Sequence, residues 1–162
     1  MAVMILGIVF YGLQYARERP DAGELLLRGE TIFPDRSLTP GAVRPVTLSE
    51  ICSFGDGDLD PRVPAATEKA VMQEYGLPTG TMRKNYQIDY LVNPQLGGTS
   101  DIRNLWPEPY ASGKWNAEAK DELERQLHKM VCARTVDLAL AQREIETNWI
   151  AAYKKYMRHE HS

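Results

Sequence analysis

The sequence predicts an α+β domain that is mainly helical, and two observations carry this prediction. Apolar residues recur at helical spacing through most of residues 115–157, which indicates two amphipathic helices in succession. The segment YQIDYLV, residues 86–92, instead alternates and is rich in aromatic and β-branched side chains, as is typical of a strand. A chain of 162 residues is long enough for one domain with a sizeable core. We therefore expect a β-loop-α unit packed against additional helices.

Residues 1–19 form a mostly apolar stretch that ends with two arginines. The apolar run is short for a membrane span, no basic residue precedes it, and no clear cleavage site follows it. We prefer a signal or anchor segment that contacts the membrane through residues 1–16, and a buried core helix is the alternative. The first interpretation implies an exported or membrane-tethered envelope protein, and the second a cytoplasmic one.

Residues 20–45 carry four prolines and three glycines, a density that breaks regular structure, and we interpret them as a linker. The domain is expected over residues 46–158, starting with the ordered segment VTLSEIC, and residues 159–162 are a tail. Its first full helix lies between Pro64 and Gly76, because proline favours the first turn of a helix and glycine the position after its end.

Two further helices follow from apolar stripes. The first begins near Asn116, and its stripe repeats every four residues at Trp115, Ala119, Leu123, Leu127 and Val131. The second has Asp137 as a suitable N-cap, and its stripe contains Leu138, Ala141, Ile145, Trp149, Ala152 and Tyr156.

The chain has two cysteines, Cys52 and Cys132, and no CxxC pair that would suggest a zinc site. If the protein is exported, we expect a disulfide between them. A bridge that closes a loop of this length would contribute on the order of 4 kcal/mol to stability. Two separate buried thiols are the alternative if the protein is cytosolic.

Three polar side chains have suggestive positions around the predicted strand and helix. Asp89 lies at the end of the strand, Asn104 in the return of the loop, and Asn116 at the start of the helix. Magnesium needs only one or two protein oxygens, and Asp89 with Asn116 offers such a pair. In the alternative, Asn104 bonds to loop backbone and Asn116 is only a helix cap.

The segment IDYLVNPQLGGTSDIRNLWPEPYASGKWNAEAKDELE, residues 88–124, resembles the HNH, or ββα-metal, endonuclease motif. A wider stretch, about residues 39–157, is similar to a group of small, mostly uncharacterised bacterial proteins. The HNH resemblance implies Asp89 and Asn116 as ligands of a divalent metal, Mg²⁺ or Mn²⁺. It also implies that Asn104 braces the loop and helps to orient the general base.

Tyr90 occupies the position of the general-base histidine in this motif. An imidazole with a pKa near 6.5 accepts a proton at neutral pH, whereas a tyrosine with a pKa near 10 is already protonated, and losing general-base help costs about 10²- to 10⁴-fold in rate. Among the other candidates for the general base, we expect His128 to be a structural or surface residue and Glu108 to be solvated. His159 and His161 lie in the tail.

These observations favour a degenerate HNH endonuclease-like protein, non-catalytic or weakly active, that retains divalent-metal or phosphate binding. One alternative is an active metal-dependent nuclease that hydrolyses phosphodiester bonds, with nucleic acid as its partner. The other is a structural or protein-binding envelope domain that uses NLWPEPY, residues 104–110, as an exposed contact. The net charge of −3 argues against indiscriminate nucleic-acid binding through bulk charge, so any nucleic-acid contact must be local.

Overall fold

The structure is a computed structural model that describes residues 33–53, 61–78, 86–110 and 113–157. Within these residues it confirms the predicted α+β, mainly helical fold. The predicted signal or anchor segment and the tail lie outside the described residues, as does the part of the predicted linker before Phe33. Among the helices that are described, none is long and apolar enough to cross a membrane.

The regular elements follow one another as helix, helix, hairpin and helical pair. In chain order they are α3 (Leu48–Ile51), α4 (Ala65–Glu74), β1 (Tyr86–Tyr90), β2 (Leu105–Pro109), α5 (Ala117–Cys132) and α6 (Leu138–Tyr156). Short 3-10 turns at Pro94–Leu96 and Ile102–Asn104 shape the connection between the strands. The sequence did not predict β2, because LWPEP contains two prolines, which cannot donate to a sheet.

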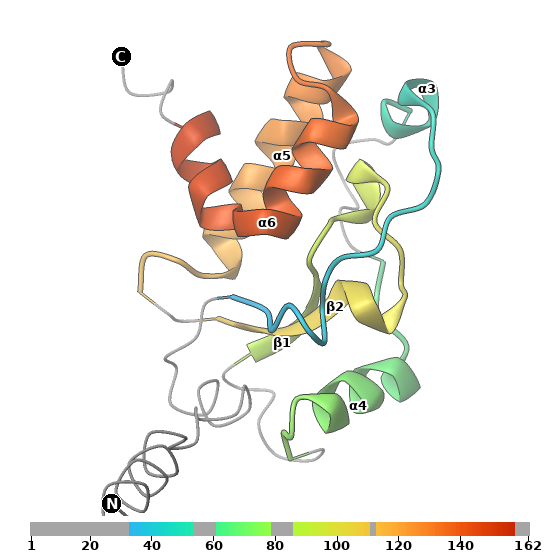
Figure 1. Cartoon of the computed structure of the whole chain (residues 1–162), viewed down its shortest axis with the longest axis vertical. Helices are drawn as coiled ribbons and strands as arrows, with labels where there is room; N and C mark the ends of the chain where they lie inside the picture. The colour runs from blue at the N-terminus through green and yellow to red at the C-terminus, as the bar shows by residue number, and fades with distance from the viewer. Residues whose placement is uncertain (1–32, 54–60, 79–85, 111–112, 158–162) are drawn as a thin grey trace, which may run out of the picture.

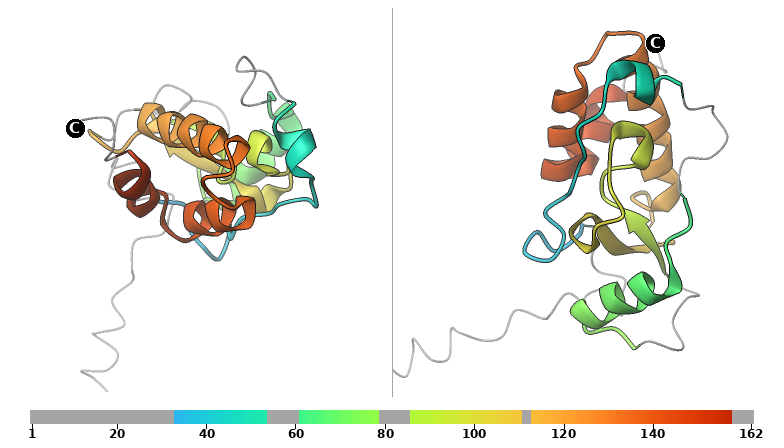
Figure 2. Two further views of the ribbon diagram at one scale, coloured as in Figure 1. Left: turned by 90° about the horizontal axis from the view of Figure 1, so that it is seen from above. Right: turned by 90° about the vertical axis from the view of Figure 1, so that its right-hand side faces the viewer.

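The antiparallel β1–β2 hairpin lies between α4 on one side and the α5–α6 pair on the other (Figures 1 and 2). Asp89 pairs with Trp106 and Tyr90 pairs with Leu105 in the register of the strands. Because successive residues of a strand point to opposite faces, Asp89 faces α5 and Tyr90 faces α4. The hairpin thus divides neighbouring side chains between two separate environments.

The two C-terminal helices begin as the sequence predicts. The side chain of Asn116 accepts a hydrogen bond from the backbone N–H of Ala119, and that of Asp137 accepts from Leu140, so both are N-caps. The predicted apolar stripes are buried apart from Trp115 and Leu138, which are partly exposed. The interruption of α6 was not predicted. Asn148 has non-helical backbone angles, φ −169° and ψ 92°, and its side chain caps the helical turns that follow.

Residues 33–46, most of which belong to the predicted linker, are ordered against the loop between the strands. The N–H of Arg44 donates to the carbonyl of Gly97 at 2.9 Å, and that of Thr99 donates to Ala42 at 3.0 Å. The hydroxyl of Thr39, which is fully buried, donates to the carbonyl of Leu105 at 2.8 Å. We call residues 33–46 the strap, because they run along the strand connection and hold it in place.

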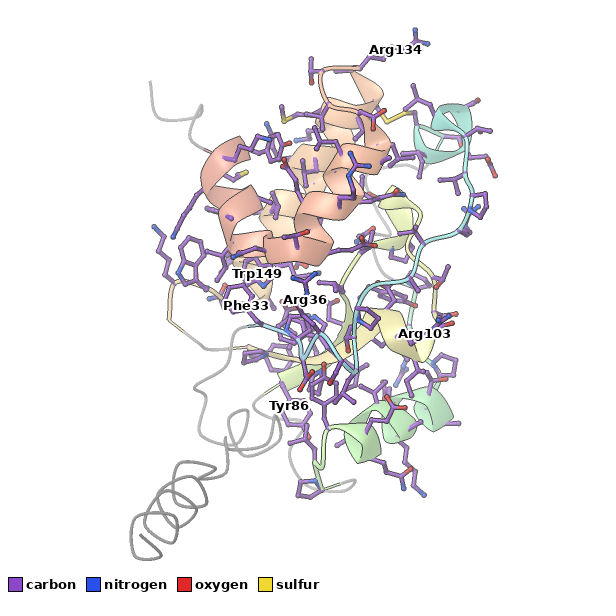
Figure 3. The ribbon with its side chains drawn as sticks, viewed as in Figure 1. Phe33, Arg36, Tyr86, Arg103, Arg134 and Trp149 are labelled. Carbon is purple, nitrogen blue, oxygen red and sulfur yellow. A yellow bond between two sulfur atoms is a disulfide. The ribbon has the colours of Figure 1, made fainter. Side chains whose placement is uncertain are left out.

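The predicted disulfide between Cys52 and Cys132 is confirmed, with 5.5 Å between the two Cα atoms. It joins the end of α3 to the last residue of α5, and appears as a yellow bond in Figure 3. His128 lies one turn earlier on α5, and its Nε2 is 3.0 Å from the carbonyl oxygen of Ile51. His128 therefore has a structural role, one of the two that the sequence predicts, because this contact joins α3 to α5 beside the bridge.

Candidate functional site

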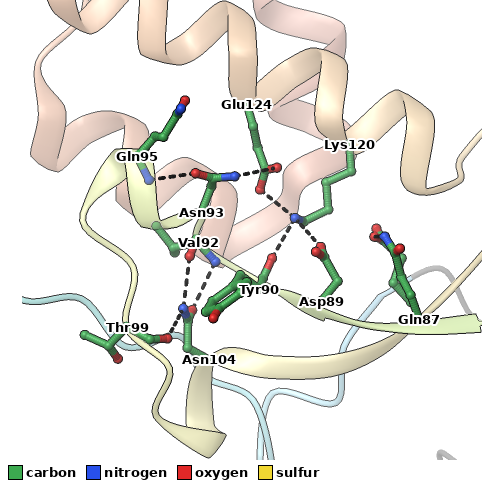
Figure 4. A network of polar contacts seen from close by, with 11 residues as sticks. Gln87, Asp89, Tyr90, Val92, Asn93, Gln95, Thr99, Asn104, Lys120 and Glu124 are labelled. Carbon is green, nitrogen blue, oxygen red and sulfur yellow. Dashed lines mark hydrogen bonds and ion pairs between the residues drawn. The ribbon is translucent and has the colours of Figure 1, made fainter. Parts of the chain in front are cut away.

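A buried ion-pair cluster occupies the face of the hairpin that packs against α5. At its centre is the ammonium of Lys120, which lies 2.7 Å from Oδ2 of Asp89 and 2.5 Å from Oε1 of Glu124. It also donates to the carbonyl oxygen of Tyr90 at 2.6 Å (Figure 4). The side chain of Lys120 is fully buried, so one cation has three oxygen acceptors away from water.

The sequence of α5 explains how a charged group reaches this position. Lys120 and Glu124 are four residues apart, so they are neighbours on one helix face. That face also carries Leu123 and Leu127, both fully buried, and the aliphatic stem of Lys120 continues this surface. Sequence reasoning missed Lys120 and Glu124. The signal that could have found them is an oppositely charged pair, four residues apart, beside an apolar stripe.

Burial and the neighbouring carboxylates have opposite effects on the pKa of Lys120. Burial alone lowers the pKa of an ammonium, but the charges of Asp89 and Glu124 outweigh this effect and raise the pKa of Lys120 well above its ordinary value. Lys120 therefore stays charged in the folded protein. It supplies the positive charge that the carboxylates around it require.

Glu108 is buried, which contradicts the expectation of a solvated side chain, because β2 places it opposite Gln87 on the α5 face. Its Oε2 accepts a long hydrogen bond of 3.4 Å from Nε2 of Gln87, and its Oε1 has no hydrogen-bond partner within the described chain. Burial and then the nearby charge of Asp89 raise the pKa of Glu108 well above its ordinary value. This carboxyl group therefore favours its protonated form.

Asn104 braces the loop between the strands through hydrogen bonds to its backbone, which is the structural alternative that the sequence offered for it. Its side-chain Nδ2 donates to the carbonyls of Val92 and Thr99, both at 2.9 Å, and its Oδ1 accepts from the N–H of Val92 at 3.0 Å (Figure 4). Its Oδ1 is also 3.4 Å from the N–H of Ala42 in the strap. Asn104 is fully buried, so these contacts fix the loop from within.

A second asparagine links this loop to the ion-pair cluster. The side-chain Oδ1 of Asn93 accepts from the N–H of Gln95 at 2.7 Å, and its Nδ2 lies 3.4 Å from Oε2 of Glu124. Asn93 is almost completely buried. The loop and the first half of α5 are thus connected by buried polar contacts as well as by packing.

The structure does not place Tyr90 beside Asp89 as a partner in chemistry. The hydroxyl of Tyr90 donates to the carbonyl of Pro61 at 3.1 Å, on the α4 side of the hairpin. Only its backbone oxygen faces the cluster, where it accepts from Lys120. The phenol at the motif's general-base position is therefore turned away from the carboxylate.

The two residues predicted as metal ligands are each engaged otherwise. Asp89 is 3% exposed and holds the ammonium of Lys120. Asn116 uses its side-chain oxygen to cap α5 at 3.0 Å from the N–H of Ala119, while its Nδ2 donates to Gly113. These contacts do not fit a divalent metal, because a cation already satisfies the carboxylate and little of Asp89 reaches solvent. The described part of the chain contains no group of three or more His, Cys, Asp or Glu side chains placed to hold a metal ion.

Two remaining predictions concern the other histidines and the NLWPEPY segment. His159 and His161 lie outside the described residues. Residues 104–109 are buried, which contradicts the expectation of an exposed contact, because they form the end of the loop and β2. Only Tyr110, 48% exposed, remains at the surface.

Comparison of the chain with protein-family models, with curated proteins and with solved structures found no match.

Proposed function

We propose that this protein is a non-cleaving relative of HNH endonucleases that binds nucleic acid through a ββα unit. The order of β1, loop, β2 and α5 supports the proposal, since these elements follow the order of a ββα-metal motif. Asn104 adds support, because it holds the loop at both ends through Val92 and Thr99. This framework holds the loop and the start of α5 rigid against each other, as a binding surface requires.

The contact between Lys120 and Asp89 is the observation that carries the non-cleaving part of the proposal. A metal-dependent nuclease needs a divalent ion that binds phosphate and activates water. In this chain the ammonium of Lys120 already pairs with the carboxylate of the motif, at 2.7 Å and away from solvent. An ammonium provides charge but no open coordination position for a water or a phosphate oxygen.

Tyr90 supports the same conclusion independently. Its hydroxyl is directed to Pro61 on the far face of the hairpin, and an ordinary tyrosine is protonated at neutral pH. Neither the position nor the chemistry of this side chain suits a general base. For this reason we expect Tyr90→His to leave the protein without nuclease activity.

The experiment compares binding and cleavage on the same nucleic acids. Purified protein is incubated with supercoiled plasmid and with single-stranded DNA and RNA, in Mg²⁺, Mn²⁺ or EDTA. We expect complexes in gel shift or fluorescence anisotropy, with no nicking in any metal. Metal-dependent nicking that disappears in Asp89→Ala would overturn the proposal in favour of an active nuclease. The absence of any complex would overturn nucleic-acid binding.

The disulfide favours a second proposal, that the domain works in the cell envelope, either in this role or as a structural or protein-binding module. Cys52 and Cys132 are bonded at the junction of α3 and α5, and such bonds persist mainly in oxidising compartments. Cell fractionation combined with thiol labelling tests this location. Recovery of the protein in the cytoplasm with both thiols reduced would contradict it.

A further inference from the structure

Trp115, immediately before the cap of α5, is partly exposed and has two ammonium groups over its ring. Nζ of Lys114 lies 5.0 Å from the ring centroid and Nζ of Lys154 lies 5.3 Å from it. The two lysines are distant in the sequence, since one precedes α5 and the other lies near the end of α6. The fold thus gathers two cations around one indole ring.

Two aromatic side chains of α6 fix the orientation of this ring. Trp149 packs edge to face against it, with ring centroids 6.2 Å apart and an interplanar angle of 84°. Tyr153 does the same, with a centroid distance of 5.5 Å and an angle of 79°. The hydroxyl of Tyr153 is itself anchored, because it donates to Oε2 of Glu122 at 2.7 Å. Edge-to-face packing of this kind is favourable. Trp115 is therefore held rigidly on its inner side, while its outer part reaches solvent.

Within the described parts of the chain, no ion pair balances the charges near the ring. Lys155 pairs with Glu144 at 2.6 Å, but among the described residues Lys114 and Lys154 have no carboxylate partner. Both of these lysines are exposed. Packing against the core explains the buried edge of Trp115, but it does not require two unpaired cations over the ring. A ligand with both an aromatic face and negative charge would match the ring and the two cations together.

We propose that Trp115, Lys114 and Lys154 form a stacking site for an unpaired base of single-stranded nucleic acid, with the two ammonium groups contacting the adjoining phosphates. Single-stranded nucleic acid combines the two properties that this site matches, since its bases offer a free aromatic face and its backbone is anionic. A base in a duplex offers no such face. The site rests on the proposed nucleic-acid binding, and it identifies single strands as the substrate class.

Intrinsic fluorescence provides a direct readout, because the chain has three tryptophans and two of them, Trp106 and Trp149, are at most 1% exposed. Quenching by an added oligonucleotide therefore reports on Trp115. We expect poly(dT) or poly(U) to quench the fluorescence, and a labelled oligonucleotide to bind with the same affinity by anisotropy. Binding without quenching would overturn the stacking site.

Variants separate this site from nucleic-acid binding in general. Trp115→Ala should weaken binding of single strands about tenfold or more, as expected for the loss of one stacked base, and Trp115→Phe should recover most of the loss. Lys114→Ala with Lys154→Ala should reduce the slope of log affinity against log salt by about 1.4, since each phosphate contact on a single strand contributes about 0.7. The exposed Tyr110→Ala and Lys69→Ala serve as controls, and circular dichroism checks folding.

The outcomes distinguish two failures. If the unaltered protein binds no nucleic acid, the proposed function fails, and this site fails with it. If the protein binds single strands but Trp115→Phe, Trp115→Ala and the double lysine variant all bind equally well, only the stacking site is overturned. Preference of the unaltered protein for duplex over single strands would also overturn the stacking site.

Discussion

The ammonium of Lys120 and the carboxylate of Asp89 form an ion pair 2.7 Å long with almost no exposure to solvent. Each charge is tolerated inside the protein only because the other is present. Their separation along the chain, 31 residues, makes this contact a tertiary link between α5 and β1. The pair therefore stabilises the packing of the helix on the hairpin as well as defining the candidate site.

Removal of the cation should be among the most damaging substitutions in the domain. Lys120→Met keeps an apolar stem but leaves Asp89 and Glu124 buried without a counter-charge, and we expect a loss of about 3–5 kcal/mol in the free energy of unfolding. Urea denaturation measures the change. Lys129→Met, at an exposed position of the same helix, is the matched control, and equal stability of the two variants would contradict the structural role of the pair.

The raised pKa of Glu108 predicts a pH-dependent stability. Burial and the charge of Asp89 raise this pKa in the folded protein above the ordinary value of 4.5. Such a group contributes its full stability below the unfolded pKa, and the contribution is lost as the pH rises through the folded pKa. Glu108→Gln should therefore gain stability relative to the unaltered protein as the pH increases. Urea denaturation at a series of pH values tests this, with Glu118→Gln at an exposed site as the control. Parallel curves for Glu108→Gln and the unaltered protein would refute it.

Asn104→Ala should loosen the loop and the strap together. The change leaves the N–H and carbonyl of Val92 and the carbonyl of Thr99 without their partner. Each unsatisfied buried group costs about 1–3 kcal/mol, so the total loss should be about 3 kcal/mol or more. Hydrogen exchange at the Val92 amide should accelerate in parallel. Asn116→Ala removes only a helix cap and should cost about 1 kcal/mol, so an equal cost for the two variants would contradict this bracing role.

Gly98 should not tolerate even alanine. A Cβ atom at this position would lie 1.7 Å from the carbonyl oxygen of Val92, so the loop backbone would have to move. We expect Gly98→Ala to lose several-fold more stability than Gly76→Ala, where the added Cβ meets nothing within 4 Å and only the positive φ of 67° opposes it. Thermal denaturation compares the two variants. Similar melting temperatures would show that the loop can rearrange.

Loss of the disulfide should destabilise the domain by about 4 kcal/mol, as expected for a bridge that closes a loop of 80 residues. The double variant Cys52→Ser, Cys132→Ser measures this in urea denaturation. Maleimide labelling of the denatured, unreduced protein should add no mass, and labelling after reduction should add two groups. Modification of either cysteine before reduction would refute the bridge.

The helices α5 and α6 could be predicted from the sequence because their signals are local. The stripes of α5 and α6 repeat within a few residues, and the caps Asn116 and Asp137 act within one turn. The strap was interpreted as linker because its bonds, such as Thr99 to Ala42, join distant segments. The prolines of the strap predict an irregular backbone. They do not indicate which residues that backbone contacts.

The candidate site was predicted less well, for a related reason. Asp89 and Asn104 were singled out from the sequence, and Asn104 bonds to loop backbone, which both the HNH resemblance and its structural alternative allow. The HNH resemblance placed Asp89 and Tyr90 in one site, although adjacent residues of a strand face opposite sides. Lys120 was missed, since pairing across 31 residues has no local signal. A charged residue beside a buried stripe was the only available indication.

The bond between Cys52 and Cys132 also divides the chain mechanically. Everything between these residues, including the hairpin and all of α5, belongs to one covalent ring. The strap and α6 lie outside the ring and are attached to it at its two joined cysteines. A force that pulls the ends of the chain apart therefore passes through the disulfide. Once the strap and α6 have detached, the backbone of the hairpin carries no tension. Reduction would expose the buried ion pair to that load.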